Sequence, residues 1–249
     1  MDNNLICSIL IAIFILSANI GINNIFAHNF STDDDSSFLT LINKILIENR
    51  LLNDSLTTNI NNGSYAESFA HTKNIERILS DILISEESFS IDSDQFYNNT
   101  IIALVVANLA DEVLRNYGHA FGIPSNVMLS MNFSKVSNIQ NMSSNENNMS
   151  TAHSSHLPDQ VYETIMIDRD SYHNAIQISN RMSELYNDEL KGFLSTSTDV
   201  IHAMSRLADA LIDLNDDLEA KESPYKIMGN IHGVIHPNLQ IAFNLTLKR

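Results

Sequence analysis

The stretch that decides the fold is DQFYNNTIIALVVANLADEVLRNY, residues 94–117. Its apolar side chains recur mostly at helical intervals, beginning with Phe96 and ending with Tyr117. Recurrence at three and four residues is the period of an α-helix with a buried face, so the stretch predicts a helix over 94–117. Gly118 is expected to end that helix, and Pro124 disfavours its resumption.

The same spacing predicts further helices along the chain. They cover about 37–53, a segment that opens at Ser64, about 169–193 and about 198–219. Pro224 is expected to start a last helical stretch. Pro237 is expected to interrupt that stretch, because proline lacks the N–H that a helix interior uses.

Two pairs of segments resemble each other and indicate an internal repeat. SYAESFAHTKNI at 64–75 parallels SYHNAIQISNRM at 171–182, and NLADEVL at 108–114 parallels RLADALI at 206–212. A helix–loop–helix unit would then occur twice, and two such hairpins can pack as a four-helix bundle. We therefore predict an all-α fold: a helical bundle built from two helix–loop–helix hairpins, with a long disordered connection between them.

Charge and cysteine usage exclude several functions. The 249 residues include 14 Lys and Arg against 30 Asp and Glu, a net charge of −16. Such a chain lacks the excess of basic residues that binding to nucleic acid or to an anionic membrane surface requires. Cys7 is the only cysteine and lies in the apolar leader, so the remaining chain has no disulfide, thiol nucleophile or Cys-ligated metal.

The leader, residues 1–27, is apolar from Leu5 to Ala18. That run spans about 21 Å as a helix, short of the roughly 30 Å hydrocarbon core of a bilayer. Its length and the small residue Ala27 are typical of a secretory signal peptide. The start of the leader has no Lys or Arg, so an uncleaved N-terminal membrane anchor is the alternative. Either way the rest is expected to be extracytoplasmic, with membrane contact only through the leader.

Composition divides the rest of the chain into three regions. They are an N-terminal helical hairpin region at 28–117, an Asn/Ser/Met/His-rich disordered linker at 118–157 and a C-terminal helical hairpin region at 158–249. N-x-S/T sequons in or near the linker, at Asn132, Asn141 and Asn148, are candidate glycosylation sites in an exported protein.

The linker also contains candidate copper ligands. Methionines at 128, 131, 142 and 149 lead into a His-x-x-His pair, and we select Met142, Met149, His153 and His156 as ligands. Thioethers and imidazoles together suit copper, above all Cu(I). The competing interpretation is a low-complexity spacer in which these residues occur by chance.

A second candidate metal pair is His232 and His236 in IHGVIHPNLQ. Spacing of four residues places two imidazoles on one face of a helix, as in many zinc and copper sites. Gly233 and Pro237 weaken the prediction, since the residue before a proline is pushed away from helical geometry.

Enzyme signatures are missing from the sequence. The chain has no G-x-S-x-G, H-E-x-x-H, phosphate-loop or G-x-G-x-x-G motif. A di-iron bundle would need two Glu-x-x-His motifs, whereas the chain offers Asp170-x-x-His173 and Asp199-x-x-His202. We therefore expect a protein that is not an enzyme.

Several segments carry a resemblance to a known group. They are GSYAESFAH at 63–71, LADEVLRNYGHAFG at 109–122, the Asn/Ser/Met loop and SPYKIMGNIHGVIHPNLQIAFNL at 223–245. In these the chain resembles uncharacterised secreted helical proteins of ammonia-oxidising archaea, a group with no assigned activity. Those organisms depend on copper enzymes outside the membrane, so the resemblance makes copper handling more plausible.

Three functions are compatible with these observations. The first is an exported, non-enzymatic helical binding or interaction module of the cell surface, whose partner is an unidentified protein. The alternatives are an extracytoplasmic protein that binds copper or another metal ion through Met and His, and a structural component of the cell envelope.

Overall fold

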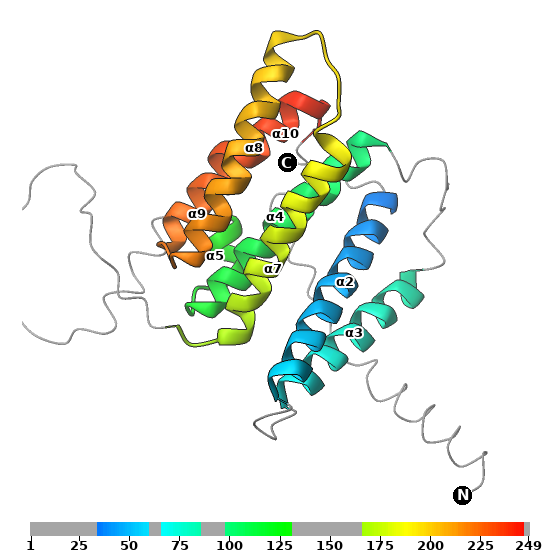
Figure 1. The fold of residues 1–249 in the computed structure, drawn as a ribbon, viewed down its shortest axis with the longest axis vertical. Helices are drawn as coiled ribbons and strands as arrows, with labels where there is room; N and C mark the ends of the chain where they lie inside the picture. The colour runs from blue at the N-terminus through cyan, green and yellow to red at the C-terminus, as the bar shows by residue number, and fades with distance from the viewer. Residues whose placement is uncertain (1–33, 60–65, 86–97, 131–165, 247–249) are drawn as a thin grey trace, which may run out of the picture.

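A computed structural model of the chain describes residues 34–59, 66–85, 98–130 and 166–246. In these residues the secondary structure is helical and no strand occurs. The predicted all-α helical bundle is therefore confirmed (Figure 1). None of the described helices combines the length and apolar character that crossing a membrane requires.

Helix α4, Asn99–Ala120, forms the centre of the molecule. It is buried on nearly all sides, and side chains such as Val105, Leu109 and Val113 are fully enclosed. A helix that is apolar around most of its circumference needs neighbours on every side. Those neighbours are α2, α5, α7 and the C-terminal helices.

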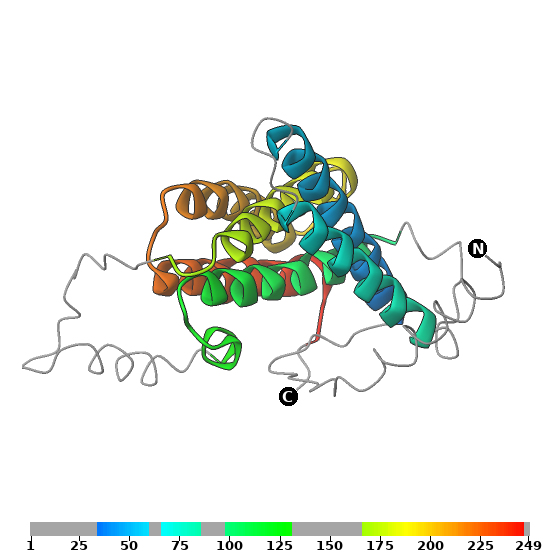
Figure 2. The same ribbon diagram turned by 90° about the horizontal axis from the view of Figure 1, so that it is seen from below.

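Three helical segments complete a bundle around α4. Helix α7, Arg169–Leu185, continues into a π-helical turn η3, Tyr186–Leu190, and α8 is Thr198–Glu219. The C-terminal rod consists of α9, Pro224–Asn230, the π-helical turn η4, Ile231–Ile235, and α10, His236–Phe243. Helices α7 and α8 form one layer, and α4 and the rod lie beneath it in Figure 2.

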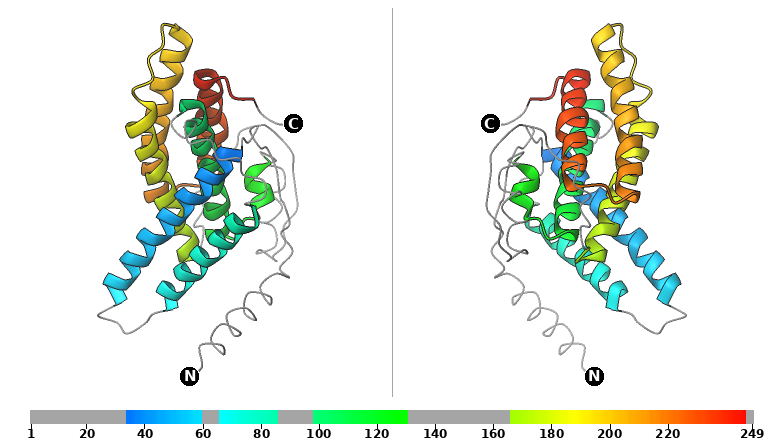
Figure 3. Two further views of the ribbon diagram at one scale, coloured as in Figure 1. Left: turned by 90° about the vertical axis from the view of Figure 1, so that its right-hand side faces the viewer. Right: turned by 90° about the vertical axis from the view of Figure 1, so that its left-hand side faces the viewer.

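Helices α2, Asp34–Asn59, and α3, Ala66–Ser85, form a separate hairpin. Helix α2 crosses α4 and α7, whereas α3 packs mainly on α2 at the outer edge (Figure 3). The N-terminal hairpin therefore joins the first two predicted helices, not the second and third as the internal repeat suggested. The bundle takes α4 from the N-terminal region and the other three segments from the C-terminal region.

Pro237 does not interrupt the C-terminal rod, contrary to prediction. His236 keeps helical backbone angles, φ −59° and ψ −47°, and its N–H donates to the Ile231 carbonyl across the π-turn η4. The widened turn before Pro237 relieves the clash that a proline ring makes with the preceding turn.

The described start of the predicted linker is ordered, so the prediction of disorder is wrong for 118–130. Helix α4 continues to Ala120, and Pro124 precedes a short helix α5, Ser125–Leu129, whose apolar side chains are buried. Gly118 lies inside α4 rather than ending it. The absence of a side chain there makes room for Met128, whose Cγ would collide with a Cβ at this position. Met128 is thus a core residue, not part of a loop.

Candidate functional site

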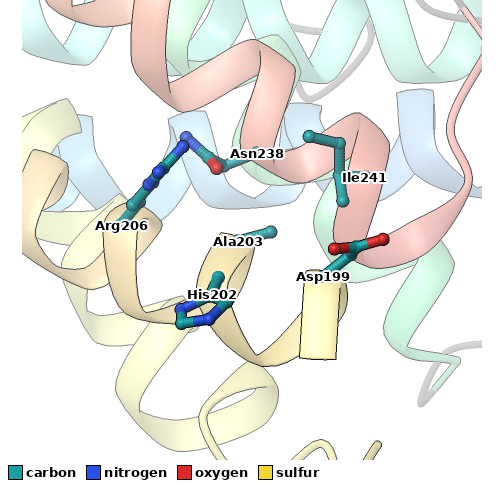
Figure 4. A pocket seen from close by; sticks show the side chains of 6 residues that line it. All are labelled: Asp199, His202, Ala203, Arg206, Asn238 and Ile241. Carbon is teal, nitrogen blue, oxygen red and sulfur yellow. The ribbon is translucent and has the colours of Figure 1, made fainter. Parts of the chain in front are cut away.

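A surface groove lies between α8 and α10. Its α8 wall is formed by Asp199, His202, Ala203 and Arg206. These positions follow the spacing i, i+3, i+4 and i+7, which places them on one face of a helix. Asn238 and Ile241 of α10 form the facing wall (Figure 4).

The groove face of α8 is held in place by the opposite, apolar face of the same helix. Met204, Leu207 and Leu211 are buried against the bundle. Asp199 lies in the first turn of α8, where the positive end of the helix dipole stabilises a carboxylate. The polar groove residues therefore lie on a helix whose position is fixed by its core contacts.

The α10 wall is anchored in the same way. Leu239 and Ala242 are buried, and Asn238 is only 5% exposed. The Asn238 amide donates to the Val234 carbonyl at 2.7 Å, which fixes the side chain and leaves its Oδ1 as an acceptor. Ile241 is 52% exposed and provides an apolar surface at the groove.

Arg206 forms no ion pair with the carboxylates of the described residues. Its side chain points toward Asn238, and Asp199 lies at the other end of the groove (Figure 4). Among the described arginines, Arg50 contacts Glu184 at 2.7 Å, and Arg77, Arg115 and Arg181 are also paired with carboxylates, whereas the exposed Arg169, like Arg206, forms no ion pair there. A groove with a carboxylate at one end and a guanidinium at the other can bind a ligand by ion pairs and hydrogen bonds.

The predicted pair His232 and His236 lies on one face of the rod. Their ring centroids are 5.3 Å apart, in an edge-to-face arrangement. His236 Nε2 is 3.7 Å from Asp111 Oδ1 of α4, and both residues are buried. His232 Nε2 is 3.2 Å from the Met128 carbonyl.

Asp111 is the most electrostatically perturbed group in this cluster. Burial raises its pKa to about 7, and Arg115 opposes the shift. Its Oδ1 has no hydrogen bond within the described residues. The carboxyl group is therefore held in its neutral form at a pH where an exposed aspartate is ionised.

The other predicted site residues lie outside the described residues. They are the candidate metal ligands Met142, Met149, His153 and His156 and the candidate glycosylation sites Asn132, Asn141 and Asn148. Within the described part, no three His, Cys, Asp or Glu side chains form a group that could hold a metal ion. Copper binding stays a prediction.

Sequence reasoning missed two features. The spacing of Asp199 and His202 is visible in the sequence, but the residues that face them on α10 are determined by tertiary packing. The buried contact between His71 Nδ1 and Glu48 Oε2, at 2.8 Å, joins α3 to α2 over 23 residues. The sequence offers one indication of this contact: His71 lies among the apolar residues of the helix that opens at Ser64.

Comparison with known proteins gave no relative. No family model matches the chain, and neither does a curated protein or a solved structure.

Proposed function

We propose that the protein is an exported, non-enzymatic helical binding module of the cell surface. The observation that supports this most is the groove between α8 and α10. It presents an exposed cation, Arg206, that no described carboxylate neutralises. The opposite charge, Asp199, lies on the same helix face two turns away.

Exposed polar groups on a packed scaffold favour recognition of a ligand. Ala203 and Asn238 are buried, so the backbone around the charges is set by core packing rather than by the ligand. A preformed site loses less conformational freedom when it binds. The groove thus has the properties of a binding surface, and we assign it no catalytic role.

Binding by the groove can be tested by NMR with the full chain. A small library of free peptides, sugars, carboxylates and amines is titrated while the α8 and α10 amides are monitored. We expect one class to shift groove amides, and Asp199→Asn with Arg206→Gln to abolish those shifts. The matched control combines Asp213→Asn with Arg169→Gln, which changes exposed charges outside the groove. No responsive class, or equal loss in the control, would overturn the proposal.

Export rests on the apolar leader at 1–27. The test is protease treatment of intact cells that express the chain with a C-terminal epitope tag. We expect the tag to be removed from intact cells or recovered from the medium. Full protection until the cells are lysed would contradict export.

Copper binding is a second candidate function, supported by the 5.3 Å approach of the His232 and His236 rings. Copper retained after dialysis would be measured on the parent and on a variant with both His232→Asn and His236→Asn. A nanomolar site survives dialysis, so retention below about 0.1 equivalent by the parent would exclude it. A third candidate, a structural component of the cell envelope, requires stable homo-oligomers in solution sizing.

A further inference from the structure

We propose that the α8–α10 groove binds a short peptide of about three residues with both termini free. The peptide ammonium contacts Asp199 and its carboxylate contacts Arg206. This inference rests on the proposed binding function and names the ligand class of the same groove.

The axial offset between Asp199 and Arg206 on α8 sets the length of the ligand. Asp199 and Arg206 are seven residues apart on α8, which corresponds to about 10 Å along the helix axis. An extended peptide spans about 3.3–3.6 Å per residue, so three residues bridge about 10 Å. A single amino acid is too short to reach both charges, and a longer chain would carry one terminus beyond the groove.

The middle of the groove suits the backbone and small side chains of a peptide. His202 and Ala203 lie between the two charges on α8, and Ile241 provides apolar surface from α10. Asn238 Oδ1 is free to accept a peptide N–H, because the amide nitrogen of the same side chain already donates to Val234. Residues such as alanine match these surfaces.

The charges also set the direction of the peptide. A carboxylate beside Asp199 would meet a like charge, and an ammonium beside Arg206 would do the same. Only one of the two orientations pairs both termini with opposite charges. Blocking either terminus should therefore weaken binding even though the rest of the peptide is unchanged.

The experiment is an NMR titration of the full chain at pH 7 and low salt with tri-alanine. N-acetyl-tri-alanine and tri-alanine amide are compared with it, together with di-alanine and penta-alanine. We expect a Kd on the order of 1 mM for tri-alanine. Each block should weaken binding about threefold to fivefold, the size expected of an exposed ion pair. Di-alanine and penta-alanine should also bind more weakly.

Two variants provide a crossed control. In Arg206→Gln, amidation of the peptide should no longer weaken binding, whereas acetylation still should. In Asp199→Asn, the sensitivities should be reversed. Asp213→Asn, an exposed carboxylate outside the groove, should behave like the parent. Unchanged amide spectra away from the groove show that each variant is folded.

The outcomes distinguish the peptide assignment from the more general proposal that the groove binds a ligand. Equal binding of free and blocked peptides, or no crossover in the variants, overturns the peptide assignment. If a sugar or another ligand shifts the groove amides and peptides do not, the peptide assignment fails but the binding function stands. If no compound shifts them, both fail.

Discussion

The four-helix bundle and the α2–α3 hairpin are held together by different kinds of contact. In the bundle, side chains such as Leu114, Leu207 and Leu239 are fully buried in one hydrophobic core. Two of its tyrosine hydroxyls bond to backbone carbonyls of α8: Tyr172 donates to Leu218 at 2.8 Å and Tyr186 donates to Met204 at 3.0 Å. The helices of the bundle are thus held together by buried apolar side chains, with a few hydrogen bonds between them.

The hairpin holds most of the buried polar side chains of the described residues. They are Asp35, Ser36, Asn43, Glu48, Ser55, Ser68 and His71. Several of them contact one another across the two helices: the Ser55 and Ser68 hydroxyls are 2.8 Å apart, and His71 Nδ1 is 2.8 Å from Glu48 Oε2. Leucines on the outer side remain exposed, with Leu79 at 46% and Leu83 at 53%.

Ion pairs also connect the hairpin to the bundle. Lys44 of α2 contacts Glu112 of α4 at 2.9 Å. Arg50 donates to both carboxylate oxygens of Glu184 on α7, at 2.7 and 2.9 Å. Such contacts contribute less net stability than apolar burial of similar extent. We therefore expect the groove to lie on the more stable half of the molecule.

The largest effect is expected in the bundle core. Leu109→Ala removes a fully buried side chain of α4 and should lower the free energy of unfolding by about 3–5 kcal/mol. The same substitution on the outer side of the hairpin, Leu79→Ala, should cost less than about 1 kcal/mol because that side chain is already half exposed. Denaturant titrations measure both values. Equal losses would remove the contrast between the two halves.

Asp111 makes the bundle sensitive to pH. Its folded pKa of about 7 lies above the unfolded value, so its contribution to stability decreases as pH rises from 4 to 7. Three pKa units correspond to a decrease on the order of 4 kcal/mol. Asp111→Asn should remove this pH dependence and be more stable than the parent at pH 8. A variant with the parental pH profile of unfolding would contradict this.

Substitution of Glu112, which connects the bundle to the hairpin through Lys44, is expected to have a smaller effect on the free energy of unfolding. Burial alone would raise the pKa of Glu112, but Lys44 and Arg115 lower it below its usual value. Its stabilising contribution is therefore present at neutral pH and is lost as pH falls through the folded pKa. Glu112→Gln should cost about 1–2 kcal/mol at pH 7 and less at pH 3. The loss should appear as faster hydrogen exchange in α2, with α8 unchanged.

The smallest effect concerns the hairpin itself. The hydrogen bond with Glu48 raises the pKa of His71, although burial opposes it. Because a raised histidine pKa stabilises the fold at low pH, this contribution is lost as pH rises through the folded value. His71→Gln should cost about 1 kcal/mol at pH 6 and less at pH 8. His173→Gln serves as a control, and an equal pH dependence in both variants would be contrary to expectation.

Periodicity predicted the helices because each has an apolar face. The bounds of α8 agree with the sequence, and Pro224 begins α9 as expected. Partners were harder to predict: α3 pairs with α2 through polar side chains that carry no periodic signal. The continuation of the rod through Pro237 depends on a π-turn, which the sequence pattern does not indicate.

The groove was only partly accessible from sequence for a similar reason. Asp199 and His202 are spaced for one helix face, and that spacing is visible in the sequence. Asn238 and Ile241 join them only because the rod folds back along α8. Contacts between residues about 40 positions apart depend on packing, which local patterns do not specify.

Hydrogen exchange of the full chain, followed by mass spectrometry at pH 7, tests the central contrast most directly. Peptides from α4 and α8 should exchange only through global unfolding, whereas those from α2 and α3 should exchange through a lower-energy opening of the hairpin. That result would show that the groove belongs to the more stable half of the molecule. Equal protection in both halves, or lower protection in α8 than in α2, would contradict it.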